Sequence, residues 1–455
     1  MQIPQPLIQS LQGLPGFQAQ RFIDAHDRPE PVTSIRLNPS KPVSHATLFD
    51  GDIPLNPVPW SSLGYYLQER PSFTFDPLFH AGCYYVQEAS SMFLEQVLRQ
   101  TVDLTQPLRV LDLCAAPGGK STHLQSLLSA DSLLVSNEVI RARTQILKDN
   151  IIKWGTANVA VTTNDPADFA ALNGYFDVIV VDAPCSGSGL FRRDEAAVGE
   201  WSEHNVSLCS QRQQRILADV LPALKTDGVL VYSTCSYSPQ EDEQILDWLC
   251  KTFDMESIPL KVDDAWQITT TRTGQNAYGY RFWPYHVKGE GFFLTVLKKR
   301  EYVKTLNIPK PSLKQISMPS KTIVSKWLRD IETMSLVSFG DKIYAWPEKL
   351  FNDFNLLAKT LRVVYSGTAI GTLMRDKLVP DHAMAMSPLR SEEIIMTLLE
   401  KDAAIAYLSR KDFETDAPKG WQLAAYKHQP LGWMNILPNR INNYYPKELK
   451  ILKAQ

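Results

Sequence analysis

The chain has 455 residues, of which 44% are hydrophobic and 21% charged, and these values indicate a globular protein of two or three domains. No apolar run reaches about eighteen residues, so no membrane-spanning helix is expected. The N-terminus lacks a basic stretch followed by an apolar core, so no secretory signal is expected, and the protein is predicted to be cytoplasmic. The net charge of −2 argues against indiscriminate nucleic-acid binding, although residues 301–455, with 22 Lys and Arg against 16 Asp and Glu, suit either a phosphate-facing module or an ordinary solvated surface.

Residues 1–95 are rich in proline and irregular. A helix is predicted over 15–27, and the stretch TSIRLNPSKP at 33–42 predicts a strand that leads into a proline-ended turn. We treat these residues as a separate N-terminal region.

From Arg109 onward, short apolar strands alternate with helices. Strands are predicted over 109–114, 132–138, 157–165, 176–184, 228–236 and 291–299. Helices are predicted over 119–129, 141–155, 211–225 and 238–253, with Gly155 ending the second and Ser238 as the N-cap of the fourth. The alternation predicts a doubly wound α/β sheet over residues 96–300, with strand 176–184 in mid-sheet and strand 291–299 closing it.

The remaining residues are expected to form a linker and a smaller domain. Residues 301–320 hold several prolines and lysines with little periodicity, which is typical of a linker. Residues 321–455 predict an α+β domain with strand-like pieces at 342–347, 361–373 and 420–437.

The loop after the first predicted strand, in LDLCAAPGGKSTHL, lies where an open α/β sheet binds its ligand. Gly118 and Gly119 allow the backbone to approach a ligand closely, and the following helix N-terminus favours an electronegative group. The stretch GGKST resembles the end of a phosphate-binding loop, but Cys114 stands where such a loop needs glycine, and Pro117 removes a backbone N–H. Both positions argue against the alternative of a P-loop nucleoside-triphosphatase.

Acidic residues end the next two predicted strands. Glu138 suits a ribose diol, and Asp165 could accept a hydrogen bond from an exocyclic amine, although either acid alone is more often a helix N-cap. Together with the glycine loop, they favour one nucleoside-like ligand. Because the phosphate cradle is absent, S-adenosyl-L-methionine is expected rather than NAD or ATP.

The six cysteines include no C-x-x-C pair, which argues against a zinc site, and no metal is expected; their positions are 83, 114, 185, 209, 235 and 250. Cys185 and Cys235 each follow the end of a buried strand, and Asp182 stands three residues before Cys185. A thiol beside an acid suits methylation of cytosine at carbon 5, because thiolate addition to carbon 6 makes carbon 5 nucleophilic.

Five segments carry a resemblance to the Sun-type RNA (cytosine-5) methyltransferases: DLCAAPGGKSTHL, SNEVIRAR, FDVIVVDAPCSGSGLFRRD, LVYSTCSYSPQEDEQIL and YGYRFWPYHVKGEGFF. They cover roughly residues 85–300, with YVQEASSM just upstream. The paired PCSG and TCS motifs are the specific part of this resemblance.

The resemblance implies a Rossmann-like methyltransferase sheet in which Cys235 is the nucleophile, Cys185 promotes product release and Asp182 contacts the base. The implied cofactor contacts are Cys114, Ala115, Ala116, Pro117, Gly118, Gly119, Lys120, Glu138, Arg143, Asp165 and Asp182. Residues 1–95 would be an RNA-binding region. The end of the chain, LGWMNILPNRINNYYPKELK, is similar to the tail of larger bacterial members that carry a PUA-like domain, which implies 16S rRNA as the target and a monomer.

Two alternatives stay open at this point. The target could be tRNA instead of rRNA. A non-catalytic RNA-binding assembly factor would be expected to lack Cys235, Asp182 or the glycines, all of which are present.

Overall fold

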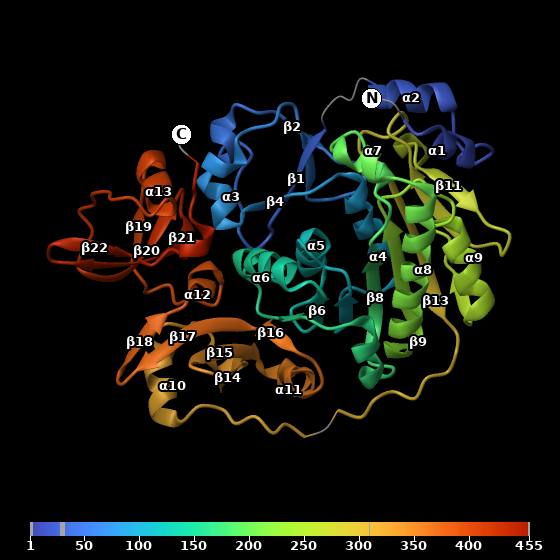
Figure 1. The fold of residues 1–455 in the computed structure, drawn as a ribbon. Helices are drawn as coiled ribbons and strands as arrows, with labels where there is room; N and C mark the ends of the chain where they lie inside the picture. The colour runs from blue at the N-terminus through green and yellow to red at the C-terminus, as the bar shows by residue number, and fades with distance from the viewer. Residues whose placement is uncertain (1–2, 28–31, 309, 454–455) are drawn as a thin grey trace.

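One large mixed sheet organises the computed structural model, which describes residues 3–27, 32–308 and 310–453 (Figure 1). Its strand order is β11-β12-β13-β9-β8-β5-β6-β7-β16, with β10 paired to β13. The strands are β5 (Arg109–Asp112), β6 (Leu133–Asn137), β7 (Val159–Thr162), β8 (Phe176–Asp182), β9 (Leu224–Thr234), β10 (Met255–Ser257), β11 (Thr269–Arg272), β12 (Tyr278–Phe282), β13 (Phe292–Lys299) and β16 (Val363–Ser366).

The five strands β5 to β9 run parallel to one another, and β8 lies between β5 and β9 in mid-sheet. The predicted doubly wound sheet is therefore confirmed. The prediction that residues 291–299 close the sheet is wrong, because β12 and β11 continue it beyond β13. The alternating aromatic residues of YGYRF, at 278–282, are typical of a strand and add this antiparallel hairpin.

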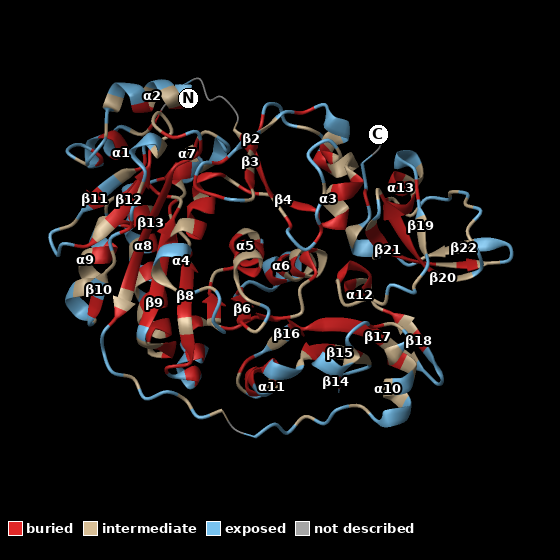
Figure 2. Ribbon diagram, turned by 180° about the vertical axis from the view of Figure 1, so that it is seen from behind, coloured by how far each residue is buried: buried red, intermediate tan, exposed pale blue. Residues whose placement is uncertain are grey.

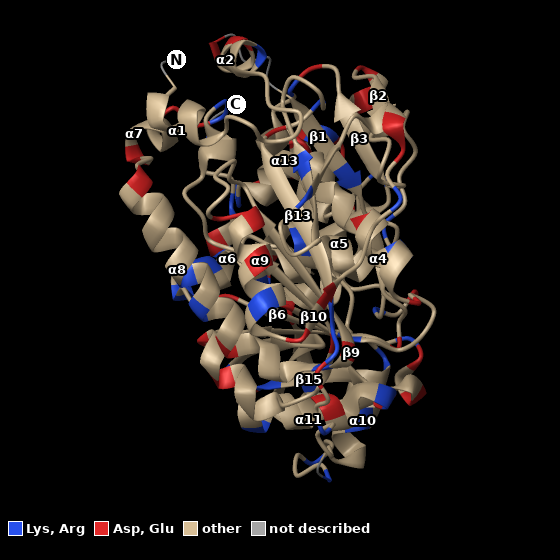
Figure 3. Ribbon diagram, turned by 90° about the vertical axis from the view of Figure 1, so that its right-hand side faces the viewer, with Lys and Arg blue, Asp and Glu red and all other residues tan. Residues whose placement is uncertain are grey.

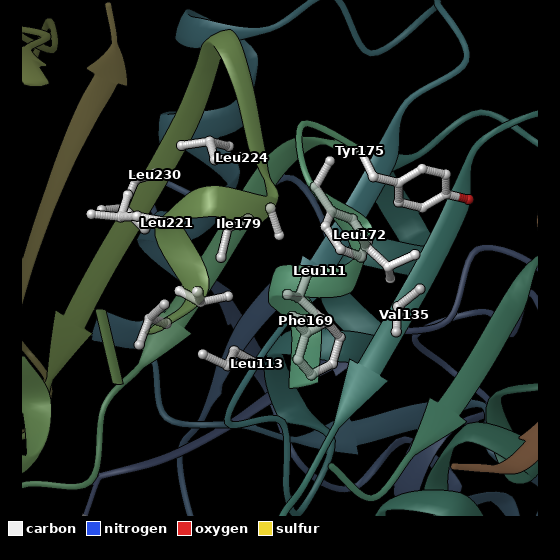
Figure 4. Packing of buried hydrophobic residues seen from close by; sticks show 14 of the residues in the cluster. Leu111, Leu113, Val135, Phe169, Leu172, Tyr175, Ile179, Leu221, Leu224 and Leu230 are labelled. Carbon is white, nitrogen blue, oxygen red and sulfur yellow. The ribbon is translucent and has the colours of Figure 1, made fainter. Parts of the chain in front are cut away.

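Helices cover both faces of the sheet, because alternate strand residues point to opposite sides. Leu111 packs on the side of α8 and α9, whereas its neighbour Val110 packs on the side of α4, α5 and α6. Figure 4 shows the first of these cores, where Leu111 and Ile179 lie among leucine and aromatic side chains. The helices are α4 (Leu94–Thr101), α5 (Gly119–Leu127), α6 (Arg141–Trp154), α7 (Ala196–Glu200), α8 (Glu203–Val220) and α9 (Glu243–Thr252).

Gly155 ends α6 in a left-handed conformation (φ 101°), as predicted. Two predicted helix starts are wrong. Ser202 caps α8, which begins at Glu203, eight residues before the predicted start at 211. The helix α9 begins at Glu243 instead of following Ser238, because the intervening acids turn into the protein interior.

A four-stranded antiparallel sheet, in the order β2-β3-β1-β4, forms the N-terminal region and confirms the strand predicted in TSIRL. Its elements are α1 (Gln5–Ser10), α2 (Ala19–Asp27), β1 (Thr33–Leu37), β2 (Leu55–Pro57), β3 (Gly64–Leu67), α3 (Pro77–Ala81) and β4 (Tyr84–Val86).

The turn after β1 faces inward. Asn38 Nδ2 donates to the carbonyls of Gly82 and Trp154, and Lys41 Nζ donates to those of Ala81 and Lys153. These carbonyls end α3 and α6, where a donor or a cation is favoured. The turn therefore joins the N-terminal region to the end of α6, which packs on the large sheet.

The C-terminal part contains two four-stranded sheets, β14-β15-β17-β18 and β19-β20-β21-β22. The strands are β14 (Met334–Phe339), β15 (Lys342–Pro347), β17 (Thr368–Met374), β18 (Lys377–Pro380), β19 (Met396–Leu398), β20 (Gly420–Tyr426), β21 (Gln429–Leu437) and β22 (Arg440–Asn443). The helices are α10 (Met318–Ser325), α11 (Phe351–Thr360), α12 (His382–Met386) and α13 (Lys401–Leu408).

The stretch 361–373, predicted as one strand, is divided at Gly367 between β16 and β17. Gly367 has a φ of +61°, and a Cβ there would stand 2.4 Å from the carbonyl oxygen of Ala345. The bend sends β16 to the edge of the catalytic sheet, where it pairs with β7.

Burial extends across the junction of β16 and β17, where residues 365–371 are all buried, as the red ribbon at this junction in Figure 2 shows. Trp346 and Phe354 belong to the same core as Phe169. Asp353 is buried and accepts hydrogen bonds from Arg109 Nε (2.6 Å) and Tyr175 Oη (2.5 Å). No helix in the described ranges is both long and apolar enough to cross a bilayer.

These contacts predict that a chain ending at residue 310 folds poorly. It loses Trp346 and Phe354 from the core and exposes the edge of β7, so we expect its melting temperature to fall by roughly 10 °C or more, with aggregation. A chain ending at residue 395 keeps β16 and α11 and serves as the matched control. Calorimetry checks both chains, and equal melting temperatures would contradict the shared core.

Candidate active site

The carboxyl ends of β8 and β9 bring the two cysteine motifs of the sequence, PCSG and TCS, together. Asp182 pairs with Ser233 across the two parallel strands, and the N–H of Ala183 donates to the carbonyl of Ser233 at 2.9 Å. The chain then leaves each strand through a loop that carries a cysteine. The Sγ atoms of Cys185 and Cys235 lie 3.0 Å apart, and both side chains are partly exposed.

A buried carboxylate holds these two loops to each other. Glu241 Oε1 accepts hydrogen bonds from the N–H of Ser186 (2.8 Å) and from Gln213 Nε2 (3.1 Å). Its Oε2 accepts from the hydroxyls of Ser186 (2.5 Å) and Ser236 (2.7 Å). Because Ser186 follows Cys185 and Ser236 follows Cys235, Glu241 fixes the spacing of the thiols.

Close backbone packing adds a second constraint on the Cys235 loop. The N–H of Gly189 donates to the carbonyl of Cys235 at 2.8 Å. A Cβ at Gly189 would stand 2.7 Å from that carbonyl oxygen and 2.4 Å from the carbonyl oxygen of Gly291. A side chain at Gly189 would therefore push the loop that carries Cys235 away.

The surroundings of Cys185 favour its protonated form. The hydrogen bond with Cys235, burial and the charge of Glu241 all raise the pKa of Cys185 well above its usual value. Burial also raises the pKa of Glu241, although its hydrogen-bond donors oppose that shift. Cys185 therefore keeps its proton at neutral pH, and a thiol that keeps its proton is a poor nucleophile.

Asp182 lies at the end of β8, with its side chain 38% exposed. Its Oδ2 is 2.8 Å from Lys120 Nζ, and its Oδ1 accepts a hydrogen bond from the hydroxyl of Ser233 at 2.8 Å. Lys120 comes from the glycine loop and is nearly buried, 5.1 Å above the ring of Phe292. The structure thus places Lys120 against Asp182, between the predicted cofactor loop and the cysteines.

The glycine loop joins β5 to α5, and Gly118 caps the helix in a left-handed conformation (φ 115°). The carbonyls of the two preceding residues face α6: Arg143 donates to that of Ala116, and Asn150 to that of Pro117, each at 2.8 Å. The N–H of Ala115 donates to the carbonyl of Asn137 at 2.8 Å. The loop is therefore held in place by the neighbouring strand and helix.

Two groups at the start of this loop, Asp112 and Cys114, have raised pKa values. Burial raises the pKa of Asp112 to about 7, and the hydroxyl of Ser121 donates to its Oδ2 at 2.7 Å. Its other oxygen, Oδ1, is buried without a hydrogen-bond partner among the described residues. Burial also raises the pKa of Cys114, which excludes it as a thiolate at neutral pH.

Glu138 and Asp165 follow β6 and β7 at the same edge of the sheet. Glu138 is buried, accepts a hydrogen bond from the N–H of Ile140 at 2.9 Å and lies 3.6 Å from Arg143. Asp165 is partly exposed and caps the short helix at Pro166–Leu172, in a reciprocal capping box with Asp168. Asp165 thus has the N-cap role that sequence alone left open, and its contact with a cofactor stays a prediction.

Two residues of this site escaped sequence reasoning. Asn137 donates to the carbonyls of Leu113 and Asn164 and accepts from Thr162, so its amide links the ends of β5, β6 and β7. Glu241 stands in PQEDE, where acidic residues suggest the exposed first turn of a helix, and only the fold shows that it is buried. Within the described ranges, no group of three or more His, Cys, Asp and Glu side chains could hold a metal ion.

Three family profiles match the chain in succession. The profile for the N-terminal domain of 16S rRNA methyltransferase RsmF matches residues 3–89, that for 16S rRNA methyltransferase RsmB/F matches 99–298, and that for the methyltransferase RsmF PUA domain matches 397–451.

Similar proteins cover most of the chain. Ribosomal RNA small subunit methyltransferase F of Pectobacterium carotovorum is 35% identical over 87% of this chain and 84% of its own length. The protein of the same name from Escherichia coli K12 is 30% identical over 94% of this chain and 92% of its own length. The solved structure of a methyltransferase homolog protein from Pyrococcus horikoshii is 29% identical over 65% of this chain and 100% of its own, with a TM-score of 0.53. That of NSun6 from the same organism, with SFG, is 19% identical over 66% of this chain and 98% of its own, with a TM-score of 0.55, and shows the fold alone.

The substitution Glu241→Ala tests the link between the two cysteine loops. It leaves buried donors of Ser186, Ser236 and Gln213 without their acceptor, so we expect the free energy of unfolding to fall by about 2–4 kcal/mol. We also expect faster alkylation of both thiols, followed by mass spectrometry. The adjacent exposed Gln240→Ala is the matched control; equal stability and equal thiol reactivity in the two variants would rule out the link.

Proposed function

The chain belongs to the RsmB/F family of 16S rRNA methyltransferases, and we propose that it methylates carbon 5 of a cytosine in 16S rRNA through a covalent bond between Cys235 and carbon 6. The resemblance to the Sun-type enzymes and the C-terminal PUA domain, both expected from sequence, are confirmed. The observation that carries the finer proposal is the pair of thiols 3.0 Å apart beside Asp182.

Carbon 5 of cytosine is a weak nucleophile until a group adds to carbon 6. In the proposal, the thiolate of Cys235 forms a bond to carbon 6, and the displaced electron pair makes carbon 5 able to accept a methyl group. Cys185 is less suited to this attack, because its surroundings keep it protonated. Cys235 is held by Glu241 through Ser236 and by Gly189, which keeps the attacking sulfur in position.

Methylated carbon 5 still carries its hydrogen, and the product forms when this hydrogen leaves as a proton and the bond between carbon 6 and Cys235 breaks. The electron pair of the broken bond then returns to the sulfur of Cys235. The proton from carbon 5 passes to water. We assign Cys185 to assisting the departure of the sulfur, because its protonated thiol lies 3.0 Å from the Cys235 sulfur and can donate a hydrogen bond to the thiolate that leaves.

Asp182 is assigned to the base. Each carboxylate oxygen can accept more than one hydrogen bond, so the contacts with Lys120 and Ser233 leave capacity for a donor of cytosine. Lys120 Nζ holds the carboxylate of Asp182 at Oδ2, 2.8 Å away. A substitution at Lys120 would therefore act through Asp182.

The residues of the glycine loop fit S-adenosylmethionine. When bound, this cofactor would supply the electrophilic methyl group. The sequence of the loop lacks the glycine of a phosphate-binding loop, and Gly118 adopts a left-handed conformation that brings the backbone to the start of α5. Asp112, at the end of β5, has a buried oxygen, Oδ1, without a hydrogen-bond partner among the described residues. The residues proposed to hold the cofactor remain those named from the sequence: Cys114 to Lys120, Glu138, Arg143, Asp165 and Asp182. NSun6 of Pyrococcus horikoshii, which has a similar fold, was solved with the S-adenosylmethionine analogue SFG.

The proposed target follows from the relatives, which are named as methyltransferases of the ribosomal small subunit. The PUA domain supports RNA as the partner. A tRNA target has no observation in its favour. A non-catalytic assembly factor would not need the paired thiols or the carboxylate that fixes them.

The two cysteines can be separated by trapping. With labelled 16S rRNA, S-adenosylmethionine and a reductant, Cys235→Ala should give neither methylation nor a covalent protein–RNA species on a denaturing gel. Cys185→Ala should still attack the base and accumulate the adduct, because release is the impaired step. The double variant should behave like Cys235→Ala.

Cys209→Ala, which removes a buried thiol of α8, is the control and should turn over normally. An adduct with Cys235→Ala and none with Cys185→Ala would reverse the assigned roles. Normal turnover in both single variants would remove the covalent mechanism.

A further inference from the structure

A pocket lies where three separately folded parts of the chain meet, away from the cysteines. It is lined by the turn after β1, by the segments around residues 329 and 388–396, and by the hairpin between β20 and β21. We call it the junction pocket; its polar lining residues include Ser40, Lys41, Arg329, Arg390, His428 and Gln429. Its volume of about 440 Å³ is within the range of ligand sites.

Two arginines of this pocket come from two chain segments that are joined by backbone hydrogen bonds. The N–H of Arg329 donates to the carbonyl of Leu389, and the N–H of Ser391 donates to that of Trp327, at 2.9 and 2.8 Å. Leu328 and Arg390 form the β-bridge between these hydrogen bonds. Both arginines nevertheless line the same pocket, and the charge of Arg329 adds to burial in lowering the pKa of Arg390, so the two like charges repel each other there.

The walls of the pocket are held firmly. Lys41 Nζ donates to the carbonyls of Ala81 and Lys153, and Gln429 Nε2 donates to the carbonyl of Pro42 at 3.1 Å. Asn38 Oδ1 accepts from the N–H of Ser40. These bonds join the N-terminal turn to α6 and to the β20–β21 hairpin, so the pocket exists without a ligand to assemble it.

The balance of charge inside the pocket is positive. Lys41, Arg329 and Arg390 line the pocket with one acid, Glu392, whose side chain is 87% exposed and lies 3.5 Å from Arg329. Outside this lining, Asp330 lies 3.9 Å from Arg329. In the described part of the chain, no carboxylate pairs with Lys41 or Arg390, and Arg390 donates to the carbonyl of Ser387 at 2.8 Å. Burial lowers the pKa of Lys41 to about 7 and also lowers that of Arg390, and neighbouring cations add to both shifts.

This concentration of cations is local. Lys and Arg are interspersed with Asp and Glu over the face of the molecule in Figure 3. A set of planar arginine donors in a formed pocket matches the tetrahedral oxygens of a phosphate group.

We propose that the junction pocket binds a backbone phosphate of the substrate RNA and so positions the RNA at a distance from the methylated base. The inference rests on the proposed function, which supplies RNA as the polyphosphate ligand. The helix α6 connects the two sites: Lys153, at its end, contacts Lys41, and Arg143 and Asn150 hold the glycine loop. A phosphate held at one end of this helix is thus fixed relative to the catalytic loops at the other.

The test is RNA binding by the full-length chain, measured by fluorescence anisotropy with 16S rRNA fragments over a range of salt concentrations. For Arg329→Gln/Arg390→Gln we expect affinity to fall roughly fivefold or more at low salt and the slope of log K against log salt to drop by about 1 per lost phosphate contact. Arg390→Lys keeps the charge and should retain most of the slope. Lys359→Gln/Arg375→Gln removes two cations outside the pocket and is the matched control.

Binding of S-adenosylmethionine and the melting temperature are measured on each variant, so that a folding defect is recognised. If the double variant is misfolded, the RNA affinity and salt slope of Arg390→Lys decide the outcome. Unchanged RNA affinity and salt slope in the double pocket variant would overturn the proposal. The pocket would instead be a site for small anions if inorganic phosphate or a mononucleotide bound tightly to the wild-type chain and not to the double variant, while RNA affinity stayed the same. That result would also overturn the proposal. A third outcome separates the two proposals. If the wild-type chain binds the RNA without methylating it, and the double pocket variant loses that binding, the result would contradict the proposed function and support the pocket.

Discussion

The buried carboxylate of Glu241 is the constraint on which the geometry of the active site depends. A carboxylate removed from water is unfavourable unless its oxygens are fully hydrogen-bonded, and here four donors converge on it. Two of those donors belong to the serine after Cys185, and one to the serine after Cys235. The hydrogen bonds of this one carboxylate therefore fix the distance between two thiols that come from the ends of different strands.

The same carboxylate influences the chemistry of the thiols as well as their position. Its charge contributes to the raised pKa of Cys185. Asp182 is held in a different way, by Lys120 from the glycine loop and by Ser233 from β9. The nucleophile, the second thiol and the acid are thus each attached to a neighbouring element, which is the preorganisation that an active site needs.

The C-terminal part of the chain is bound into the catalytic domain in two ways. It contributes β16 to the edge of the sheet, and Asp353 accepts buried hydrogen bonds from Arg109 and Tyr175. A long sheet with an unpaired β7 edge would be prone to association, and β16 covers that edge. The N-terminal turn is attached similarly, by Asn38 and Lys41, so the modules around the catalytic domain share its core and its helix ends.

Much of this architecture could be predicted from local sequence. Short apolar strands alternating with helices identify the doubly wound sheet, and the end of α6 follows from Gly155 alone. The paired thiols were foreseeable because Cys185 and Cys235 both follow buried strands. The start of α9 was not, because Glu241 and Asp242 look like solvent-exposed helix residues until their distant partners are known. The place of β16 and the inward direction of Lys41 also depend on contacts more than a hundred residues apart in sequence, which no local pattern contains.

The most direct measurement of the central claim is tritium release from 16S rRNA that carries tritium at carbon 5 of its cytosines. Methylation at carbon 5 must expel the hydrogen bound there. The account predicts that tritium appears in solvent in proportion to the methyl groups transferred, and that neither occurs with Cys235→Ala. Methyl transfer to the RNA without tritium release would contradict the account, because the methyl group would then be on another atom.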